Sequence, residues 1–257
     1  MNPQTTDTDV PLIAVAHGSK DARSARAVGA LFDRVRRLRP GLDVRVAYLD
    51  HVAPDPEAAI GRLAAEGAGE VVVLPALLTA AYHSKTDLPQ ALARVRAAFP
   101  WLRVRYGDTL GPHPLLEEAV LRRLAEADVA AAPDTALVLA SAGSSDAGAN
   151  AVIEEMAARL AARGAWRAVV PAYASAASPT PGEAVARLRA AGAPRVAVAT
   201  YLLAPGFFSD RVAEQAFAAG AAAVSPALGD CPESARVVLE RYDEALAQSP
   251  RHRVPVR

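Results

Sequence analysis

The sequence predicts an α/β protein built as two tandem domains, each a small parallel sheet flanked by helices. Short apolar runs alternate with stretches of helical periodicity along the 257 residues, and this alternation is typical of right-handed β-α-β crossovers. The same order of segments occurs twice. The two copies align without a gap, because L-I-A-V-A-H-G-S-K-D at residues 12–21 lies over L-V-L-A-S-A-G-S-S-D at residues 137–146, an offset of 125. The chain therefore contains an internal duplication.

In the first half, strands are expected where short, β-branched apolar runs have the length of a buried strand. They are residues 12–16, 44–49, 71–74 and 102–106. Helices are expected where apolar residues recur every three or four positions. They are residues 21–38, 57–66, 86–99 and 114–127. Pro54 and Pro56 break the chain before the second helix and Gly67 ends it, as these residues commonly do at helix boundaries.

The second half repeats this order. Its strands are expected at residues 136–140, 168–173 and 196–201, with a weaker one near 222–224. L-G-P-H-P at 110–114 is echoed by L-G-D-C-P at 228–232, now at an offset of 118, so the second half is seven residues shorter before that point. Residues 130–134 are the expected linker. The predicted domains are residues 1–131 and 132–257.

Composition excludes several classes of function. The 28 basic and 28 acidic residues cancel, which argues against a nucleic-acid-binding protein. Cys231 is the only cysteine, so no intrachain disulfide forms and a reducing compartment is expected. The longest apolar run, residues 71–82, is shorter than the about 20 residues that span a bilayer, and the N-terminus lacks a signal-peptide pattern. We expect a cytoplasmic protein with no membrane or nucleic-acid partner, either a monomer or a homodimer.

The duplication isolates three polar residues that only the first half carries. At the offset of 125 they are His17 over Ala142, Asp50 over Ser175 and His83 over Phe208. All three follow strands of the first sheet, where ligands of open parallel sheets bind. The second half shows that the fold does not require them. Two imidazoles and a carboxylate make a mixed transition-metal site with open positions, as a catalytic site has.

Other residues near these positions have a structural and a functional interpretation. Gly18 and Ser19 recur in the second half, so their turn is at least partly structural, but its N–H groups at a helix start also suit a carboxylate ligand. Lys20, Arg23 and Lys85 are either contacts for an anionic ligand or solvated surface charges.

The remaining histidines and one aromatic position are expected to be structural. Side chains of neighbours near a strand point opposite ways, so His51 is a weaker candidate than Asp50. His113 lies between two prolines before a helix. Tyr82 lies over Phe207, which suggests an aromatic needed for packing in both halves.

Three motifs resemble those of the class II tetrapyrrole chelatases: A-H-G-S at 16–19, A-Y-L-D at 47–50 and Y-H-S-K-T-D-L-P at 82–89. They are most similar to the sirohydrochlorin chelatases, which insert cobalt or ferrous iron on the routes to cobalamin and sirohaem. The long members of that family are two such α/β domains around a cleft. The resemblance therefore implies two tandem chelatase-like domains, with a tetrapyrrole substrate in the cleft between them.

The resemblance also implies roles for residues. His17 and His83 match the metal-handling histidines, and Asp50 stands where the family has a glutamate, one methylene or about 1.5 Å longer. The residues expected to bind the substrate are Gly18, Ser19, Lys20, Arg23, Ser84 and Lys85. No cofactor is implied beyond the divalent metal substrate, and the sequence has no nucleotide-binding glycine motif. Co²⁺, Fe²⁺ and Ni²⁺ all suit such donors, so the metal stays open.

Three other functions stay open at this point. The same histidines suit a metal carrier or sensor that does not turn over. A histidine phosphatase would place arginine before its histidine, where this chain has Ala16. A regulatory binding protein has no specific motif in its favour.

Overall fold

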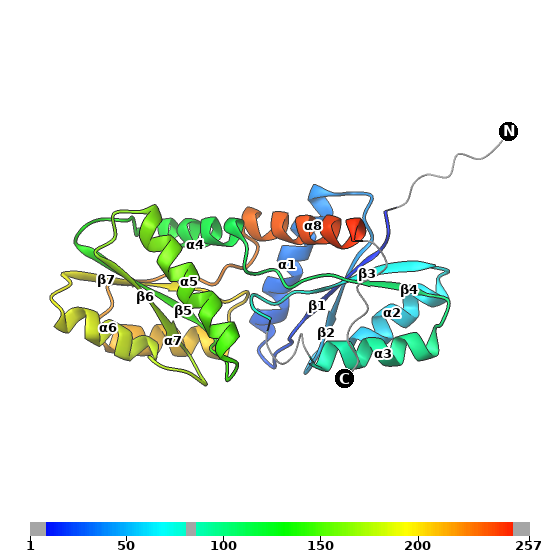
Figure 1. Ribbon diagram of the computed structural model, residues 1–257, viewed down its shortest axis with the longest axis horizontal. Helices are drawn as coiled ribbons and strands as arrows, with labels where there is room; N and C mark the ends of the chain where they lie inside the picture. Colours follow the sequence, from blue (N-terminus) through cyan, green and yellow to red (C-terminus); the bar gives the residue numbers. More distant parts are fainter. Residues whose placement is uncertain (1–8, 81–85, 249–257) are drawn as a thin grey trace.

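The computed structural model describes residues 9–80 and 86–248, which form two lobes side by side (Figure 1). Each lobe contains a four-stranded, all-parallel sheet. The first sheet has the order β2-β1-β3-β4, from β1 (Leu12–Ala16), β2 (Val44–Tyr48), β3 (Glu70–Pro75) and β4 (Arg103–Tyr106). The second has the order β6-β5-β7-β8, from β5 (Thr135–Ser141), β6 (Ala168–Tyr173), β7 (Arg195–Thr200) and β8 (Ala223–Val224). The predicted fold class is confirmed.

Helices cover both faces of the two sheets. They are α1 (Ala22–Leu38), α2 (Pro56–Ala65), α3 (Leu88–Ala98), α4 (Pro114–Glu126), α5 (Ala147–Arg163), α6 (Pro181–Ala190), α7 (Phe207–Ala218) and α8 (Pro232–Ala247). The predicted bounds differ from these by a few residues at most. The differences fall at the ends of both helices and strands. Asp21, predicted as the first residue of α1, is its N-cap instead, because its carboxylate accepts a hydrogen bond from the backbone N–H of Arg23.

The duplication extends to single backbone angles. Gly18 and Gly143 both adopt positive φ, at 91° and 83°. His51 and its counterpart Ala176 also have positive φ, 63° and 57°, although neither is glycine. The loops after β1 and β2 therefore have nearly the same backbone conformation as the loops after β5 and β6, although their side chains differ.

The two lobes exchange one helix each. Figure 1 shows α4, which ends the first half of the sequence, over the second lobe, and α8, which ends the chain, over the first. The hydroxyl of Tyr242 in α8 donates to the carbonyl of Val10 at 2.7 Å, beside the first sheet. In α4, Glu117 accepts hydrogen bonds from Arg159 and Arg163 of α5. The predicted boundary at residues 131 and 132 thus follows the sequence repeat, whereas each spatial lobe includes one helix from the other half.

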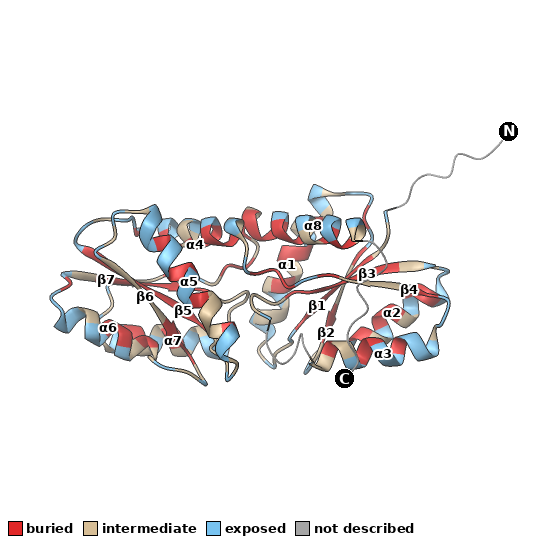
Figure 2. Cartoon of the chain, viewed as in Figure 1, coloured by how far each residue is buried: buried red, intermediate tan, exposed pale blue. Residues whose placement is uncertain are grey.

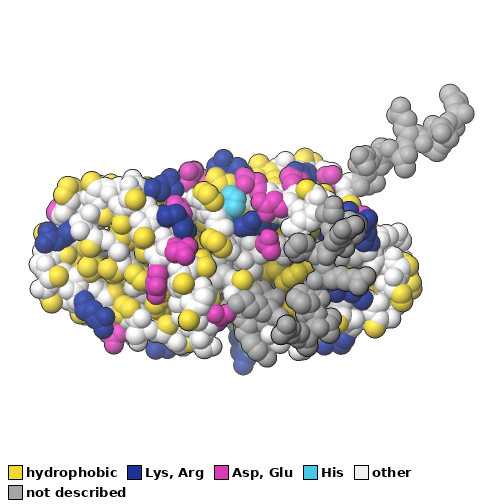
Figure 3. Space-filling model, viewed as in Figure 1, with side chains coloured by type: hydrophobic (Ala, Val, Ile, Leu, Met, Phe, Trp, Pro, Cys, Tyr) yellow, Lys and Arg dark blue, Asp and Glu magenta, His cyan; other side chains and the backbone are white. Residues whose placement is uncertain are grey.

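Ion pairs and a shared core hold the exchanged helices together. Arg122 of α4 binds the carboxylate of Glu233 in α8 through two nitrogens at 2.7 and 2.9 Å. Charged side chains gather along the upper middle of Figure 3, over the meeting ends of α4 and α8. One apolar cluster includes Leu12 and Leu74 of the first sheet together with Leu137 and Leu139 of the second. The buried residues, red in Figure 2, thus include a core that the two lobes share.

No helix among the described residues is both long and apolar enough to cross a membrane.

Candidate functional site

A cavity of about 800 Å³ lies between the two lobes. Its lining comes from the carboxyl ends of the central strands of both sheets and from the turns that lead into α1, α5 and α7. Four of the sequence-predicted site residues line it, namely His17, Gly18, Ser19 and Lys20. The corresponding turn of the second half, Ala142 to Ser144, lines it from the other lobe. The two copies of this turn thus face one common space.

Gly18 is required by the close approach of two backbone segments. A Cβ atom on Gly18 would lie 1.8 Å from the carbonyl oxygen of Asp50, and φ of 91° disfavours any side chain. Gly143 has the same conflict, at 2.0 Å from the carbonyl oxygen of Ser175. The Gly–Ser turn is therefore a repeated structural element, and glycine at this position is explained without substrate.

His17 directly precedes this turn, and a backbone hydrogen bond fixes its position. Its carbonyl accepts a hydrogen bond from the backbone N–H of Asp50 at 2.9 Å, which fixes the loop after β1 against the loop after β2. The imidazole is exposed, and its Nδ1 lies 3.1 Å from the carbonyl oxygen of Gly18. That contact favours the tautomer with the proton on Nδ1, in which Nε2 carries the lone pair that binds metals or protons.

Ser19 takes part in the cap of α1. Its hydroxyl accepts from the N–H of Asp21 at 3.1 Å, and the Asp21 carboxylate accepts from the N–H of Arg23 at 2.8 Å. Ser144 makes the matching contact to Asp146 in the second half, at 3.0 Å. Lys20 stays exposed beside the cavity.

Arg23, a predicted substrate contact, is paired with two carboxylates. Its guanidinium pairs with Asp21 and with Asp210 of α7, both at 2.5 Å, and Arg23 is not part of the cavity lining. These two carboxylates raise the pKa of Arg23 further above its ordinary value, and Arg23 lowers the pKa of Asp21. Arg23 therefore joins the two lobes across the cleft, a role that sequence did not reveal because Asp210 is 187 residues away.

Asp50 and His51 lie differently from the sequence prediction. The Asp50 side chain is 60% exposed, and Asp50 is absent from the cavity lining, whereas His51 lines the cavity. The expectation that neighbouring side chains alternate holds for extended backbone, and the positive φ of His51 breaks it. The structure thus places His51, the weaker candidate by sequence, at the cavity. A signal was available, since His51 lies over Ala176 and shares the asymmetry of His17.

Three predicted site residues, His83, Ser84 and Lys85, lie outside the described residues, as does Tyr82. Within residues 9–80 and 86–248, no three His, Cys, Asp or Glu side chains come together as a metal-binding group. The described part of the cleft thus offers individual donors rather than a closed metal cage.

The opposite wall of the cleft is apolar and aromatic. Phe207 and Phe208 start α7, line the cavity and meet edge to face at 5.5 Å between ring centroids. They are 68% and 39% exposed, so the prediction that position 207 is an aromatic needed for packing is wrong for this half. Leu202 and Leu203 extend the same wall. Contiguous exposed apolar patches commonly mark ligand-binding or partner-binding sites.

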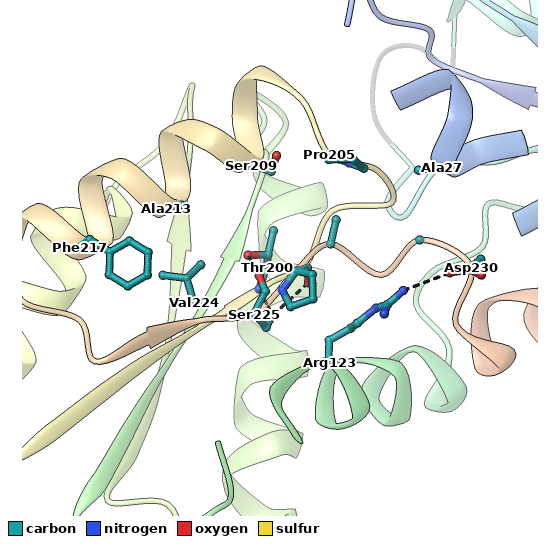
Figure 4. A pocket seen from close by; sticks show the side chains of 13 residues that line it. Ala27, Arg123, Thr200, Pro205, Ser209, Ala213, Phe217, Val224, Ser225 and Asp230 are labelled. Atoms are coloured by element: carbon teal, nitrogen blue, oxygen red, sulfur yellow. Dashed lines mark hydrogen bonds and ion pairs between the residues drawn. The ribbon is translucent and has the colours of Figure 1, made fainter. Parts of the chain in front are cut away.

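A second cavity of about 470 Å³ lies behind the edge of the second sheet (Figure 4). It is lined mainly by apolar groups such as Val224 and Phe217, and its charged residues Arg123 and Asp230 pair with each other at 3.4 Å. It contains no histidine, so it does not match the predicted chemistry.

Two parallel-sheet lobes enclose a cavity with imidazoles on one wall, so the chain is a two-domain α/β protein with a cleft between its lobes. The CbiX family pattern matches residues 11–127 and 136–245, most of both halves. The chain belongs to the CbiX family.

Comparison with known proteins gives relatives with consistent names. The chain is 29% identical over 171 residues to a sirohydrochlorin ferrochelatase of Priestia megaterium, and 30% identical over 146 residues to a sirohydrochlorin cobaltochelatase of the same organism. The matches cover 65% and 54% of this chain, and 63% and 46% of the relatives, so the chain spans less than two thirds of their length.

A solved structure of SirB from Bacillus subtilis with Fe³⁺ superposes with a TM-score of 0.83 at 23% identity. It covers 93% of this chain and 96% of that one. At this level of identity the match shows the two-lobe fold alone, and it extends over both lobes.

Proposed function

We propose that this protein is a chelatase that inserts a divalent metal ion, Co²⁺ or Fe²⁺, into a carboxylate-rich tetrapyrrole of the sirohydrochlorin type. The observation that carries the proposal is a single cavity with His17 and His51 on one wall and Phe207 and Phe208 on the other. Such a space offers nitrogen donors for an ion and apolar rings for a macrocycle. The names of the relatives support the same reaction.

Metal insertion requires the ion to lose water and the macrocycle to lose two pyrrole protons. A neutral imidazole suits either task near pH 7, because its unperturbed pKa is about 6.5. In this proposal His17 holds the incoming ion or accepts a pyrrole proton through Nε2, and His83 acts with it. The ion is a substrate that must leave with the ring, so weak and incomplete coordination by the protein favours turnover.

The second lobe supplies the surface for the ring. Phe207 and Phe208 present π faces and edges that stack on a conjugated macrocycle, a contact worth about 0.5–1.5 kcal/mol beyond area burial for each aromatic pair. Lys20 and the N-terminal end of α1 lie beside the cavity and favour the carboxylates of the substrate. We propose no contact for Arg23, and those of Ser84 and Lys85 remain predictions.

Location and assembly belong to the same proposal. The buried Cys231, whose thiol pKa is raised to about 11 by burial, fits a protein kept in the reducing cytoplasm. A monomer and a homodimer are equally compatible with one complete cleft per chain.

The experiment is an anaerobic absorbance assay with sirohydrochlorin and either Co²⁺ or Fe²⁺. The wild-type protein is expected to convert many equivalents of the macrocycle spectrum to that of the metallated product. A carrier or sensor would bind the ion without such turnover. The double variant His17→Ala/His83→Ala is expected to stay folded by circular dichroism and to lose insertion, and near-normal insertion by this variant would refute the site.

A further inference from the structure

We propose that His51 is a further metal-binding residue of the cleft, and that Asp50 is the positioning residue that orients its imidazole. This inference rests on the proposed function, since it assigns residues for the metal substrate. It reverses the ranking of the two residues made from sequence, in which Asp50 was a candidate catalytic residue and His51 the weaker candidate ligand.

The loop after β2 brings His51 to the same cavity as His17. The backbone N–H of Asp50 donates to the carbonyl of His17 at 2.9 Å, so the residues that follow β1 and β2 are locked side by side. His51 then turns with φ of 63°, and its side chain, 35% exposed, lines the cavity. Two imidazoles from adjacent strand ends thus reach one space.

The carboxylate of Asp50 contacts both the backbone and the ring of His51. Its carboxylate oxygen Oδ1 accepts a hydrogen bond from the backbone N–H of His51 at 2.8 Å, and the same oxygen lies 3.3 Å from Nδ1 of the His51 ring. A carboxylate beside Nδ1 favours the tautomer that keeps the lone pair on Nε2, and it fixes the orientation of the ring. Metal-binding histidines commonly have such a carboxylate partner, whose loss costs about 10–100-fold in affinity.

The second lobe shows that the fold does not need this pair. Ala176 has nearly the same φ as His51, and Ser175, the counterpart of Asp50, donates its hydroxyl to the carbonyl of Ala142 at 3.0 Å. The backbone bond from residue 175 to residue 142 is kept at 2.9 Å. The loop therefore adopts the same conformation without an imidazole, so folding does not require the Asp50–His51 pair of the first lobe.

The chemical consequence is selection among divalent ions. Imidazole nitrogens favour Co²⁺, Fe²⁺ and Ni²⁺ over Mg²⁺ and Ca²⁺, which prefer oxygen ligands. A nitrogen donor at residue 51 thus shifts the cleft toward the ions that a tetrapyrrole accepts, and it leaves coordination positions for the pyrrole nitrogens.

The test compares four full-length variants: His51→Ala, His51→Asn, Asp50→Asn and the control Ala176→His. Alanine is already accommodated at this backbone conformation in the second lobe, and asparagine is among the residues that best tolerate positive φ, so both His51 variants are expected to fold. Two quantities are measured. One is Co²⁺ affinity without tetrapyrrole, from the visible absorbance of the bound ion, and the other is KM for Co²⁺ and for sirohydrochlorin during insertion.

Both His51 variants are expected to weaken Co²⁺ binding and to raise KM for Co²⁺ by about 10–100-fold, with KM for sirohydrochlorin changed less than about 2-fold. Asp50→Asn is expected to act in the same direction by about 10-fold, and Ala176→His to change neither quantity. Unchanged Co²⁺ affinity in both His51 variants would overturn the inference even if the wild type inserts metal. Failure of the wild type to insert any metal would instead refute the proposed function, and the Co²⁺ titration would still decide the role of His51.

Discussion

The first and second lobes have the same sheet order and similar backbone angles in the loops that follow β1 and β2 and their counterparts β5 and β6, but they present different chemistry to the cleft. The first carries His17, the Asp50–His51 pair and Lys20, whereas the second carries Phe207 and Phe208. A duplicated backbone has thus been given two sets of side chains. Residues shared by both lobes are those that the fold requires, and residues found in one lobe alone are candidates for function in the cleft.

The Gly–Ser turn is a feature that both lobes share. Taken alone, Gly18 and Ser19 suggest an anion-binding turn, but Gly143 and Ser144 repeat both their geometry and their hydrogen bonds. The counterparts of His17 and His51 in the second lobe are Ala142 and Ala176. The second lobe also carries polar groups that the first lobe lacks. Ser141 and Tyr201 line the cavity at the positions that correspond to Ala16 and Ala76 of the first lobe.

The largest effect is expected for exchange of the residues at positions 17 and 142. His17→Ala is expected to reduce insertion by at least about 100-fold, because it removes a proton acceptor or metal donor from the reacting centre. Ala142→His is the matched control and is expected to leave the rate and the melting temperature unchanged. Steady-state absorbance kinetics check both. Rescue of His17→Ala by adding Ala142→His would show that the two lobes are interchangeable, contrary to this account.

The two turn glycines are expected to behave alike in stability. Gly18→Ala and Gly143→Ala each place a Cβ within about 2 Å of a carbonyl oxygen at positive φ, so each is expected to cost roughly 1–3 kcal/mol or more in the free energy of unfolding. Chemical denaturation measures this cost. A destabilisation confined to one of the two would show that the lobes do not share this structural requirement.

The bridge between the exchanged helices is expected to make stability depend on pH. Arg122 lowers the pKa of the buried Glu233 below its ordinary value of 4.5. Because the folded pKa is the lower one, the stabilisation is present at neutral pH and is lost as pH falls below about 4.5 and through the folded pKa.

Glu233→Gln is therefore expected to reduce stability at pH 7 by roughly 1–3 kcal/mol and to flatten the acid side of the stability curve. Urea unfolding between pH 7 and pH 3 gives the comparison, with Glu240→Gln on the same helix as the exposed control. Equal slopes in the wild type and Glu233→Gln would exclude the bridge as the cause.

The aromatic wall is expected to give the smallest effect and to affect the macrocycle alone. Phe207→Ala and Phe208→Ala are each expected to raise KM for sirohydrochlorin about 2–10-fold, corresponding to about 0.5–1.5 kcal/mol, with KM for the metal unchanged. Phe217→Ala, which removes a 55% exposed aromatic outside the cleft, is the control. If either variant raised KM for the metal alone, metal binding would involve the second lobe, contrary to this prediction.

The sequence was enough to predict most of the fold and part of the cleft. Periodicity placed β1 and β6 at their observed bounds, and the repeat predicted that the loops after the strands would share one end. It did not predict the exchange of α4 and α8, because amphipathic periodicity identifies a buried face but not the sheet that covers it. The partner of Arg23 was missed for a related reason, since Asp210 is close only in the folded chain.

The positions of His51 and Phe207 differ from the sequence predictions for local reasons. Alternation of side chains was extrapolated past the end of β2, where a positive φ redirects His51. An aromatic in both halves suggested packing at position 207, but Phe207 is exposed to the cleft. In both cases a structural rule was applied at a cavity rim, where side chains face a ligand space rather than a core.

The central claim is that metal is handled by the first lobe and the ring by the second. Crystals soaked in Co²⁺ and measured at the cobalt absorption edge test it most directly. An anomalous peak is expected within coordination distance of His17 or His51 on the first wall of the cleft. A peak beside Ala142 and Phe208, with none near His17 or His51, would contradict it.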